Sequence, residues 1–103
     1  MNLPSMLHAG PRFRLGRIFA TPAALEALGT TGVSIIKLLI CHMSGDFGEV
    51  CDSDCRQNEL ALTTNLRVLS SYPLPNGETV WVITEADRSA TTVLMPDDYR
   101  WTR

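Results

Sequence analysis

Residues 66–95 read LRVLSSYPLPNGETVWVITEADRSATTVLM, and this stretch decides the fold that we expect. Large apolar and β-branched residues fill three runs in it, which is the composition of β-strands. The three runs span residues 66–74, 78–85 and 89–95. Between the first two stands Pro75-Asn76-Gly77, and an Asn-Gly pair is the strongest short signal for a hairpin. A second turn follows at Ala86-Asp87-Arg88, so the stretch predicts an antiparallel meander of three strands.

Upstream of the meander, Thr21-Pro22 marks the start of a first helix. A threonine side chain accepts an N–H of the first turn, and proline fits the first helical position because it has no N–H to lose. We expect this helix over Ala23–Leu28, ending at Gly29, with residues 30–32 as a connector.

A second helix is predicted over Ile35–Met43, capped by Ser34 and ended by Ser44-Gly45. Its side chains are apolar nearly all round. That pattern is typical of a helix buried in the middle of a fold.

The remaining elements complete an α+β domain. Phe13–Ala20 is rich in large apolar groups and predicts a strand that Gly16 weakens or bulges. Ser53 caps a third helix from about residue 54 to 62. The order is then β-α-α-α-β-β-β, which predicts one antiparallel sheet of about four strands packed against helices. Residues 1–12 read as a flexible leader and 13–103 as the single domain.

Composition excludes several classes of protein. Of 103 residues, 45% are hydrophobic and 19% charged, as in ordinary globular domains, and the net charge is −2. A domain that wraps duplex DNA usually needs the opposite balance. The longest apolar run is broken by Lys37 and His42 and is too short to span a bilayer. Without an apolar signal segment at the start, we expect a cytoplasmic protein with reduced cysteines.

Cysteine and histidine give one alternative to weigh, a structural zinc site. Cys41, His42, Cys51 and Cys55 are residue types that zinc favours, but no second Cys-x-x-Cys or His pair closes the set. We expect Cys41 to be buried in its helix and His42 to be a satisfied residue at a helix end, where the dipole favours its cationic form. No catalytic constellation is recognisable, so we expect no enzyme activity, no metal and no cofactor.

Negative charge is concentrated after the second helix. Residues 46–59 hold five carboxylates against one arginine, a local net charge of −4. The pattern is typical either of a solvated surface or of a patch that meets a basic partner. Arg88 stands beside Glu85 and Asp87 in the second turn and is expected to fix it internally. The candidate partner-binding residues are Asp46, Glu49, Asp52, Asp54, Glu85 and Asp87.

Three segments together resemble a known family. They are residues 13–22 (FRLGRIFATP), residues 44–62 with SGDFGEV and NELAL, and residues 81–99 with WVITEADRSATTVL and PDDY. The chain resembles a family of small proteins carried by plasmids and phages that includes type II anti-CRISPR proteins. The resemblance covers about residues 13–99 and implies no catalytic residues.

The resemblance implies a function that the residues alone do not. It implies a non-catalytic inhibitor that binds a type II CRISPR effector nuclease, with or without guide RNA, and blocks nucleic-acid loading or target binding. Such a nuclease holds nucleic acid in basic channels, where an acidic patch would compete. Two alternatives stay open: the small zinc-binding protein above, and a nucleic-acid-binding accessory protein that uses Arg12, Arg14, Arg17 and Trp101.

Overall fold

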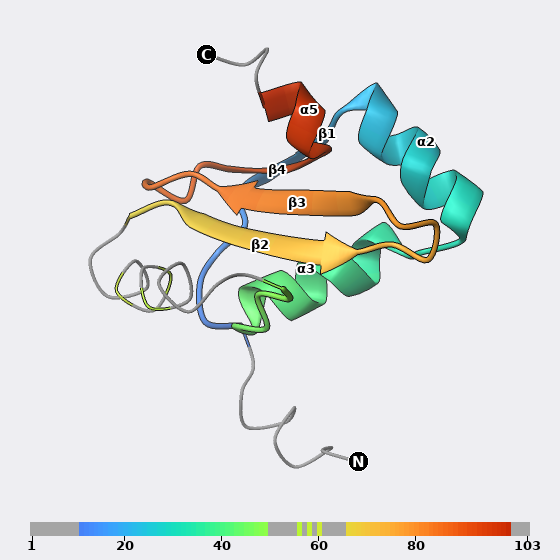
Figure 1. Ribbon diagram of the computed structural model, residues 1–103. Coiled ribbons are helices and arrows are strands. Elements are labelled where there is room, and N and C mark those ends of the chain that lie inside the picture. The colour runs from blue at the N-terminus through green and yellow to red at the C-terminus, as the bar shows by residue number, and fades with distance from the viewer. Residues whose placement is uncertain (1–10, 50–55, 57, 59, 61–65, 100–103) are drawn as a thin grey trace.

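The computed structural model describes residues 11–49, 56, 58, 60 and 66–99. This part of the chain forms a four-stranded sheet and three helices (Figure 1). In chain order the elements are β1 (Arg17–Ala20), α2 (Pro22–Thr31), α3 (Ile35–Met43), β2 (Val68–Pro73), β3 (Thr79–Thr84), β4 (Ala90–Leu94) and α5 (Pro96–Tyr99). The predicted α+β class is confirmed.

The predicted meander of β2, β3 and β4 is confirmed. These strands pair antiparallel, with Ser70 opposite Val82 and Val82 opposite Val93. At the predicted hairpin turn, the N–H of Leu74 donates to the carbonyl of Glu78 (2.8 Å) and the N–H of Gly77 donates to the carbonyl of Leu74 (3.0 Å). These two hydrogen bonds close the turn and set the register of the two strands.

The direction of β1 corrects the prediction of an antiparallel sheet. The strand order is β1-β4-β3-β2, and β1 runs parallel to β4, with Ile18 opposite Thr91. The sheet is therefore mixed. An apolar run specifies that a strand forms but not which strand it will pair with, and this pair joins residues more than 70 positions apart. The strand is also shorter than predicted, because Gly16 has φ 66° and its Cα faces the Ser89 carbonyl so closely that a side chain would collide with it.

The two long helices follow their capping signals. The bounds of α3 are as predicted, and Ser34 Oγ accepts from the N–H of Lys37 (3.3 Å). Thr21 Oγ1 likewise caps α2 by accepting from the N–H of Ala24 (3.2 Å). However, α2 does not end at Gly29. It continues to Thr31, and its left-handed cap is Gly32 with φ 73°.

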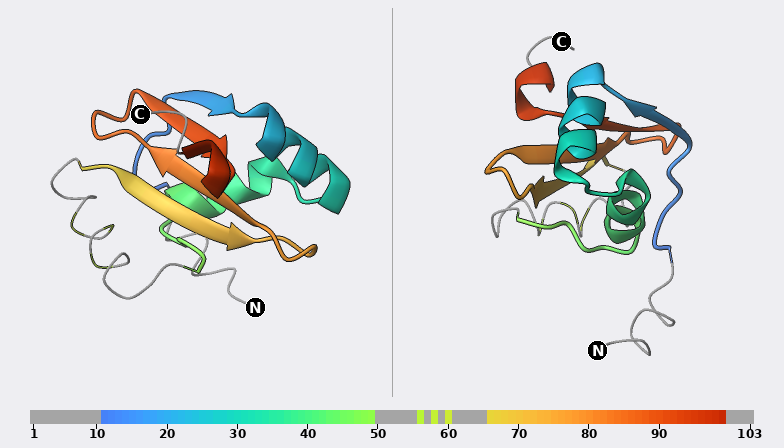
Figure 2. Two further views of the ribbon diagram at one scale, coloured as in Figure 1. Left: turned by 45° about the horizontal axis from the view of Figure 1, so that its top comes forward. Right: turned by 90° about the vertical axis from the view of Figure 1, so that its right-hand side faces the viewer.

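The α3 helix packs against one face of the sheet and α5 lies on the other, while α2 lies at the end of the sheet and adds Ala24, Ala27 and Leu28 to the core (Figure 2). The core between them includes Leu28, Leu38 and Leu39 from the helices and Val82 and Val93 from the sheet. The prediction that α3 is buried all round is wrong. The side chains of Ile36 and Ile40 on its outer face are 65% and 46% exposed.

No described helix alone is long and apolar enough to cross a bilayer, and only α2 and α3 taken together reach that length and hydropathy, as a pair bent by 108°. The predicted third helix over residues 54–62 lies mostly outside the described residues, among which Arg56, Asn58 and Leu60 are helical.

Candidate functional site: an acidic groove

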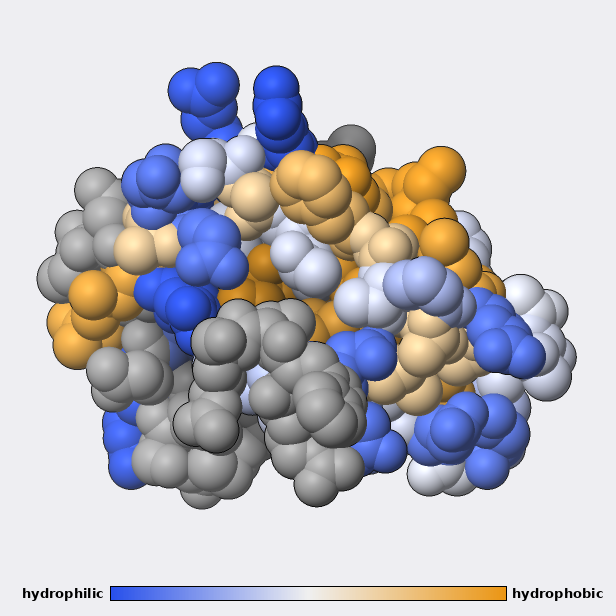
Figure 3. Space-filling view, turned by 90° about the horizontal axis from the view of Figure 1, so that it is seen from above, coloured by the Kyte–Doolittle hydropathy of each residue, from blue (hydrophilic) through white to orange (hydrophobic). Residues whose placement is uncertain are grey.

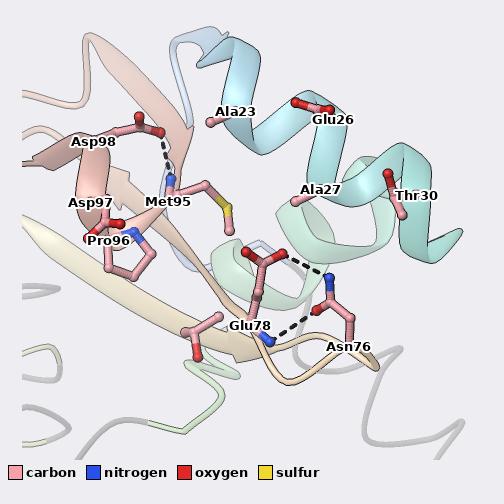
Figure 4. Close-up of a pocket in the computed structure, with 11 residues that line it drawn as sticks. Ala23, Glu26, Ala27, Thr30, Asn76, Glu78, Met95, Pro96, Asp97 and Asp98 are labelled. Carbon is pink, nitrogen blue, oxygen red and sulfur yellow. Dashed lines mark hydrogen bonds between the residues drawn. The ribbon is translucent and has the colours of Figure 1, made fainter.

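A groove of about 590 Å³ lies between α2, the turn that joins β2 to β3, and the start of α5 (Figure 4). Ala27 of α2 and Met95 after β4 give it an apolar part. The side chains of Glu78 and Met95 point toward one another across it. Its four charged lining residues are all acidic: Glu26, Glu78, Asp97 and Asp98. We call this feature the acidic groove.

Two of these carboxylates are held in place by hydrogen bonds. The side-chain nitrogen of Asn76 donates to Glu78 Oε1 (2.8 Å), and the N–H of Glu78 donates to Asn76 Oδ1 (3.0 Å). Asp98 Oδ2 accepts from the Thr21 hydroxyl (2.6 Å) and from the N–H of Met95 (3.0 Å). The second bond is the reciprocal half of a capping box for α5. The groove thus presents negative charge from fixed positions.

An acidic groove of this kind suits a positively charged group. Four carboxylates without a basic lining residue create a negative potential, and the apolar Ala27 and Met95 can contact the aliphatic stem of a lysine or arginine. Arginine also pairs with carboxylates through two parallel hydrogen bonds. The arrangement therefore fits a basic side chain presented by a macromolecular partner.

The predicted partner-binding residues do not line this groove. Asp46 and Glu49 are exposed and lie beside the outer edge of β2, where the N–H of Glu49 donates to the Ser71 carbonyl (2.6 Å). Asp46 Oδ1 accepts from the N–H of Gly48 (3.3 Å), so that carboxylate also shapes its own loop. Asp52 and Asp54 lie outside the described residues.

Glu85 and Asp87 are in the turn between β3 and β4, at the opposite end of β3 from Glu78. Glu85 forms an ion pair with Arg67 (3.6 Å) in which both side chains are nearly half exposed, so the pair adds little stability. Hydrogen bonds from the hydroxyl and N–H of Ser89 hold the pKa of Asp87 below its ordinary value. Their contact with a partner stays a prediction.

Arg88 fixes this turn, as predicted, and it does so through backbone carbonyls. Its Nη1 donates to the carbonyls of Leu66 (2.7 Å) and Glu85 (3.1 Å), and its φ is 61°. The guanidinium also lies over the ring of Phe13, 5.5 Å from the ring centre. The arginine ties the turn to two neighbouring segments of the chain.

His42 is at the end of α3, as predicted, but the structure corrects its expected charge. The side chain is fully buried, with Nδ1 2.6 Å from Ser70 Oγ and Nε2 2.8 Å from Thr84 Oγ1. Burial, assisted by the positive charge of Arg88, lowers its pKa to about 4. The helix dipole is too weak to offset this loss of solvation, so His42 is neutral at pH 7.

The hydrogen-bond chain fixes the tautomer of His42. The Thr91 hydroxyl donates to the carbonyl of Leu15 (2.7 Å), so it must accept from the Thr84 hydroxyl (2.7 Å). Thr84 in turn accepts from His42, which places the proton on Nε2 and leaves Nδ1 to accept from Ser70. Every polar atom in this buried chain is used, and the chain joins α3, three strands and the segment before β1.

This arrangement bears on the zinc alternative. Both ring nitrogens of His42 are engaged in hydrogen bonds, so neither is available as a metal ligand in this conformation. Burial and the nearby Asp46 raise the pKa of the Cys41 thiol. Among the described residues no group of three or more histidine, cysteine or acidic side chains is placed to hold a metal, while Cys51 and Cys55 lie outside them.

No protein-family model, no curated protein and no solved structure matches the chain. The resemblance to plasmid- and phage-borne inhibitors therefore stays an expectation. The fold class and the groove rest on the structure alone.

The basic residues of the nucleic-acid alternative lie away from the groove. Arg12 and Arg14 are exposed on the segment that leads into β1, Arg17 is exposed as the first residue of β1, and Trp101 lies outside the described residues. Phe13 lies between Arg12 and Arg14, but its ring is packed edge-on against His42 and under the Arg88 guanidinium, so the ring is already engaged within the fold. This segment is the surface to test for that alternative.

Sequence reasoning did not find the groove. Asp97 and Asp98 are visible as an acidic pair, but Glu26 and Glu78 are isolated charges far apart in sequence. They line one groove only because α2 packs beside β4 and the hairpin turn faces the same side. No local pattern carries that information.

Proposed function

We propose that this protein is a non-enzymatic inhibitor that binds a type II CRISPR effector nuclease through an acidic surface. The acidic groove carries the proposal, because four carboxylates and no basic residue line it. Hydrogen bonds fix two of these carboxylates, those of Glu78 and Asp98. The nuclease as partner comes from the family resemblance. The role of binding a basic surface comes from the groove.

The electrostatics favour a local contact over imitation of a long duplex. The net charge is only −2, so the protein as a whole is a weak polyanion. Charge in the groove is nevertheless concentrated, and a channel that binds nucleic acid offers lysine and arginine side chains to it. Complementary charges of this kind mainly raise the rate of association.

The described histidine and cysteine support a non-catalytic role. His42 uses both ring nitrogens within the core, and Cys41 has a raised pKa, which opposes formation of a thiolate nucleophile. The buried hydrogen-bond chain is a structural device, and the surface remains for binding.

Two triple variants with the same change in charge test the groove. The groove variant carries Glu26→Gln, Glu78→Gln and Asp97→Asn, and the control carries Asp46→Asn, Glu49→Gln and Asp87→Asn. The amide oxygens can still accept the hydrogen bonds seen at Glu78, Asp46 and Asp87. The groove variant should inhibit DNA cleavage by the nuclease about tenfold more weakly at low salt, since exposed charge pairs contribute about 0.2–1 kcal/mol each.

The outcomes separate the groove from the predicted patch. Loss of inhibition in the control alone would place the contact at Asp46, Glu49 and Asp87 and overturn the groove. Full inhibition by both variants would remove acidic contacts from the mechanism. If the unchanged protein binds no effector but binds labelled single-stranded DNA in a salt-dependent way, the accessory-protein alternative replaces the proposal.

A further inference from the structure

The two borders of the sheet differ in how their backbone is covered. At the β2 border, the side chain of Asn58 imitates a strand: its amide nitrogen donates to the Leu69 carbonyl (2.6 Å) and its amide oxygen accepts from the Leu69 N–H (3.1 Å). Two residues on, the N–H of Ser71 donates to the Phe47 carbonyl (2.9 Å). Pro73, the next residue whose backbone faces outward, has no N–H to expose. This border is closed to another strand.

The β1 border has no such cover among the described residues. The N–H groups of Arg17 and Thr21 donate to β4, at Ser89 and Val93, so the strand's alternation turns the N–H and C=O of Ile18 and Ala20 away from the sheet. No described residue forms a hydrogen bond to those outward groups. Figure 2 shows β1 along the border of the sheet, with no described segment beyond it.

The side chains of this border are apolar and half exposed. Ile18 and Phe19 each expose 50% of their surface. They point to opposite faces of the sheet, Ile18 with Ala20 toward the core side and Phe19 with Arg17 toward the side of α5. Figure 3 looks onto the side of α5 and shows apolar surface exposed among hydrophilic groups. An unpaired edge with apolar groups on both faces is the form that accepts an additional strand.

We propose that β1 pairs antiparallel with β1 of a second copy of this chain, joining two sheets into one of eight strands. Two identical strands that pair antiparallel are related by a two-fold axis. The backbone groups of Ile18 and Ala20 face outward, so both residues can form hydrogen bonds to the second copy when the axis passes beside Phe19, which lies between them. Ile18 of each copy then exchanges two hydrogen bonds with Ala20 of the other, four in all. The two Phe19 rings face each other across the axis as a cross-strand aromatic pair.

Charge complementarity supports a second copy as the occupant. In the register centred on Phe19, Arg17 of one copy stands opposite Thr21 of the other. The Thr21 hydroxyl is bonded to the carboxylate of Asp98 (2.6 Å), so each Arg17 meets a negative charge on the same face of the joined sheet. The contact occurs twice by symmetry. A strand of four residues gives a small interface, so we expect a weak, concentration-dependent dimer.

The first test removes one outward N–H. Ile18→Pro deletes a donor that β4 does not use, so the sheet should remain folded while the dimer is lost. Ile18→Val is the matched control, because it keeps the N–H and a β-branched side chain. Sedimentation equilibrium at concentrations up to about 1 mM should show dimer for the unchanged protein and Ile18→Val but monomer for Ile18→Pro. Circular dichroism spectra of the three proteins check that each is folded.

The second test locates the axis. A residue on a two-fold axis faces its own copy, so Phe19→Lys alone and Phe19→Glu alone should each be monomeric, while an equal mixture of the two should form a heterodimer. A monomeric unchanged protein at about 1 mM would overturn the proposal. So would a dimer that survives both Ile18→Pro and Phe19→Lys, since its interface would lie elsewhere, and so would a mixture that fails to associate.

Discussion

The Nε2 of His42 lies 2.8 Å from the hydroxyl of Thr84, 42 residues further along the chain, and this hydrogen bond joins the end of α3 to the end of the interior strand β3. Burial keeps this imidazole neutral at pH 7, so with Nε2 donating to Thr84, Nδ1 is left to accept from Ser70. A buried group that must stay neutral makes the fold sensitive to acid.

Acid is expected to destabilise the protein through His42 as the pH falls from 6.5 toward 4. The pKa of His42 is about 4 in the folded protein and about 6.5 when unfolded, so the unfolded chain binds the extra proton more tightly. Stability is therefore complete above pH 6.5 and falls as the pH drops toward 4, by roughly 3 kcal/mol. Urea denaturation at a series of pH values measures this, and His42→Gln should lack the slope. Equal unfolding free energies at pH 7 and pH 4.5 would contradict the buried, neutral state.

Adjacent threonines of β4 provide a matched pair. Thr91→Val breaks the buried hydroxyl chain between Thr84 and the Leu15 carbonyl, and it should cost about 1–3 kcal/mol because polar groups are left unsatisfied. Thr92→Val changes the same atoms on the opposite face, where Thr92 is partly exposed, and should stay within about 0.5 kcal/mol. Chemical denaturation of both variants measures the loss of unfolding free energy in each. Equal losses would mean that the hydroxyl chain adds nothing.

Alanine substitutions at Gly48 and Gly77 distinguish a steric clash of the new side chain from the strain of a left-handed backbone. Both have positive φ, 72° and 89°, but a side chain on Gly48 would collide with the Ser71 carbonyl, while Gly77 has open space. Gly77→Ala should cost about 1–2 kcal/mol, the ordinary penalty of a left-handed residue. Gly48→Ala should cost clearly more, because the bridge from Gly48 to Ser71 must open. A lower melting temperature for Gly48→Ala than for Gly77→Ala supports the close contact of Gly48 with Ser71, and the reverse order would refute it.

The two faces of α3 should respond differently to charge. Leu39 is only 7% exposed, so Leu39→Asp places an unpaired carboxylate in the core and should cost more than about 4 kcal/mol. Ile36 is 65% exposed on the same helix, and Ile36→Asp should leave most of the stability intact. A thermal melt of Leu39→Asp that matches the unchanged protein would show that this helix does not pack on the sheet.

Local signals predicted the elements that depend on local chemistry. Ser34 and Ser44-Gly45 bound α3, and Asn76-Gly77 makes the hairpin, because caps and turns act over a few residues. The end of α2 was missed since a single helical glycine such as Gly29 is tolerated, and the helix stops where the left-handed Gly32 closes it.

Long-range features escaped prediction for a physical reason. The parallel pairing of β1 with β4 and the presence of Glu26 and Glu78 in one groove depend on how elements pack, which hydrophobic periodicity does not encode. The same holds for α3, whose apolar sequence suggested full burial although Ile36 faces outward. The acidic segment at 46–59 was recognisable from its composition. Its contact with a partner stays a prediction.

The pairing of β1 with β4 also governs the order in which a growing chain can fold. Ala20 lies opposite Val93, so β1 has no partner until about 70 further residues have been made, which takes roughly 4–15 s at ribosomal rates. The hairpin of β2 and β3 can close before that point. A nascent chain halted before Ala90 would therefore contain the hairpin, while Ile18 and Phe19 of β1 would be unpaired. The first strand of the domain can join the sheet only after the last strand, β4, has been made.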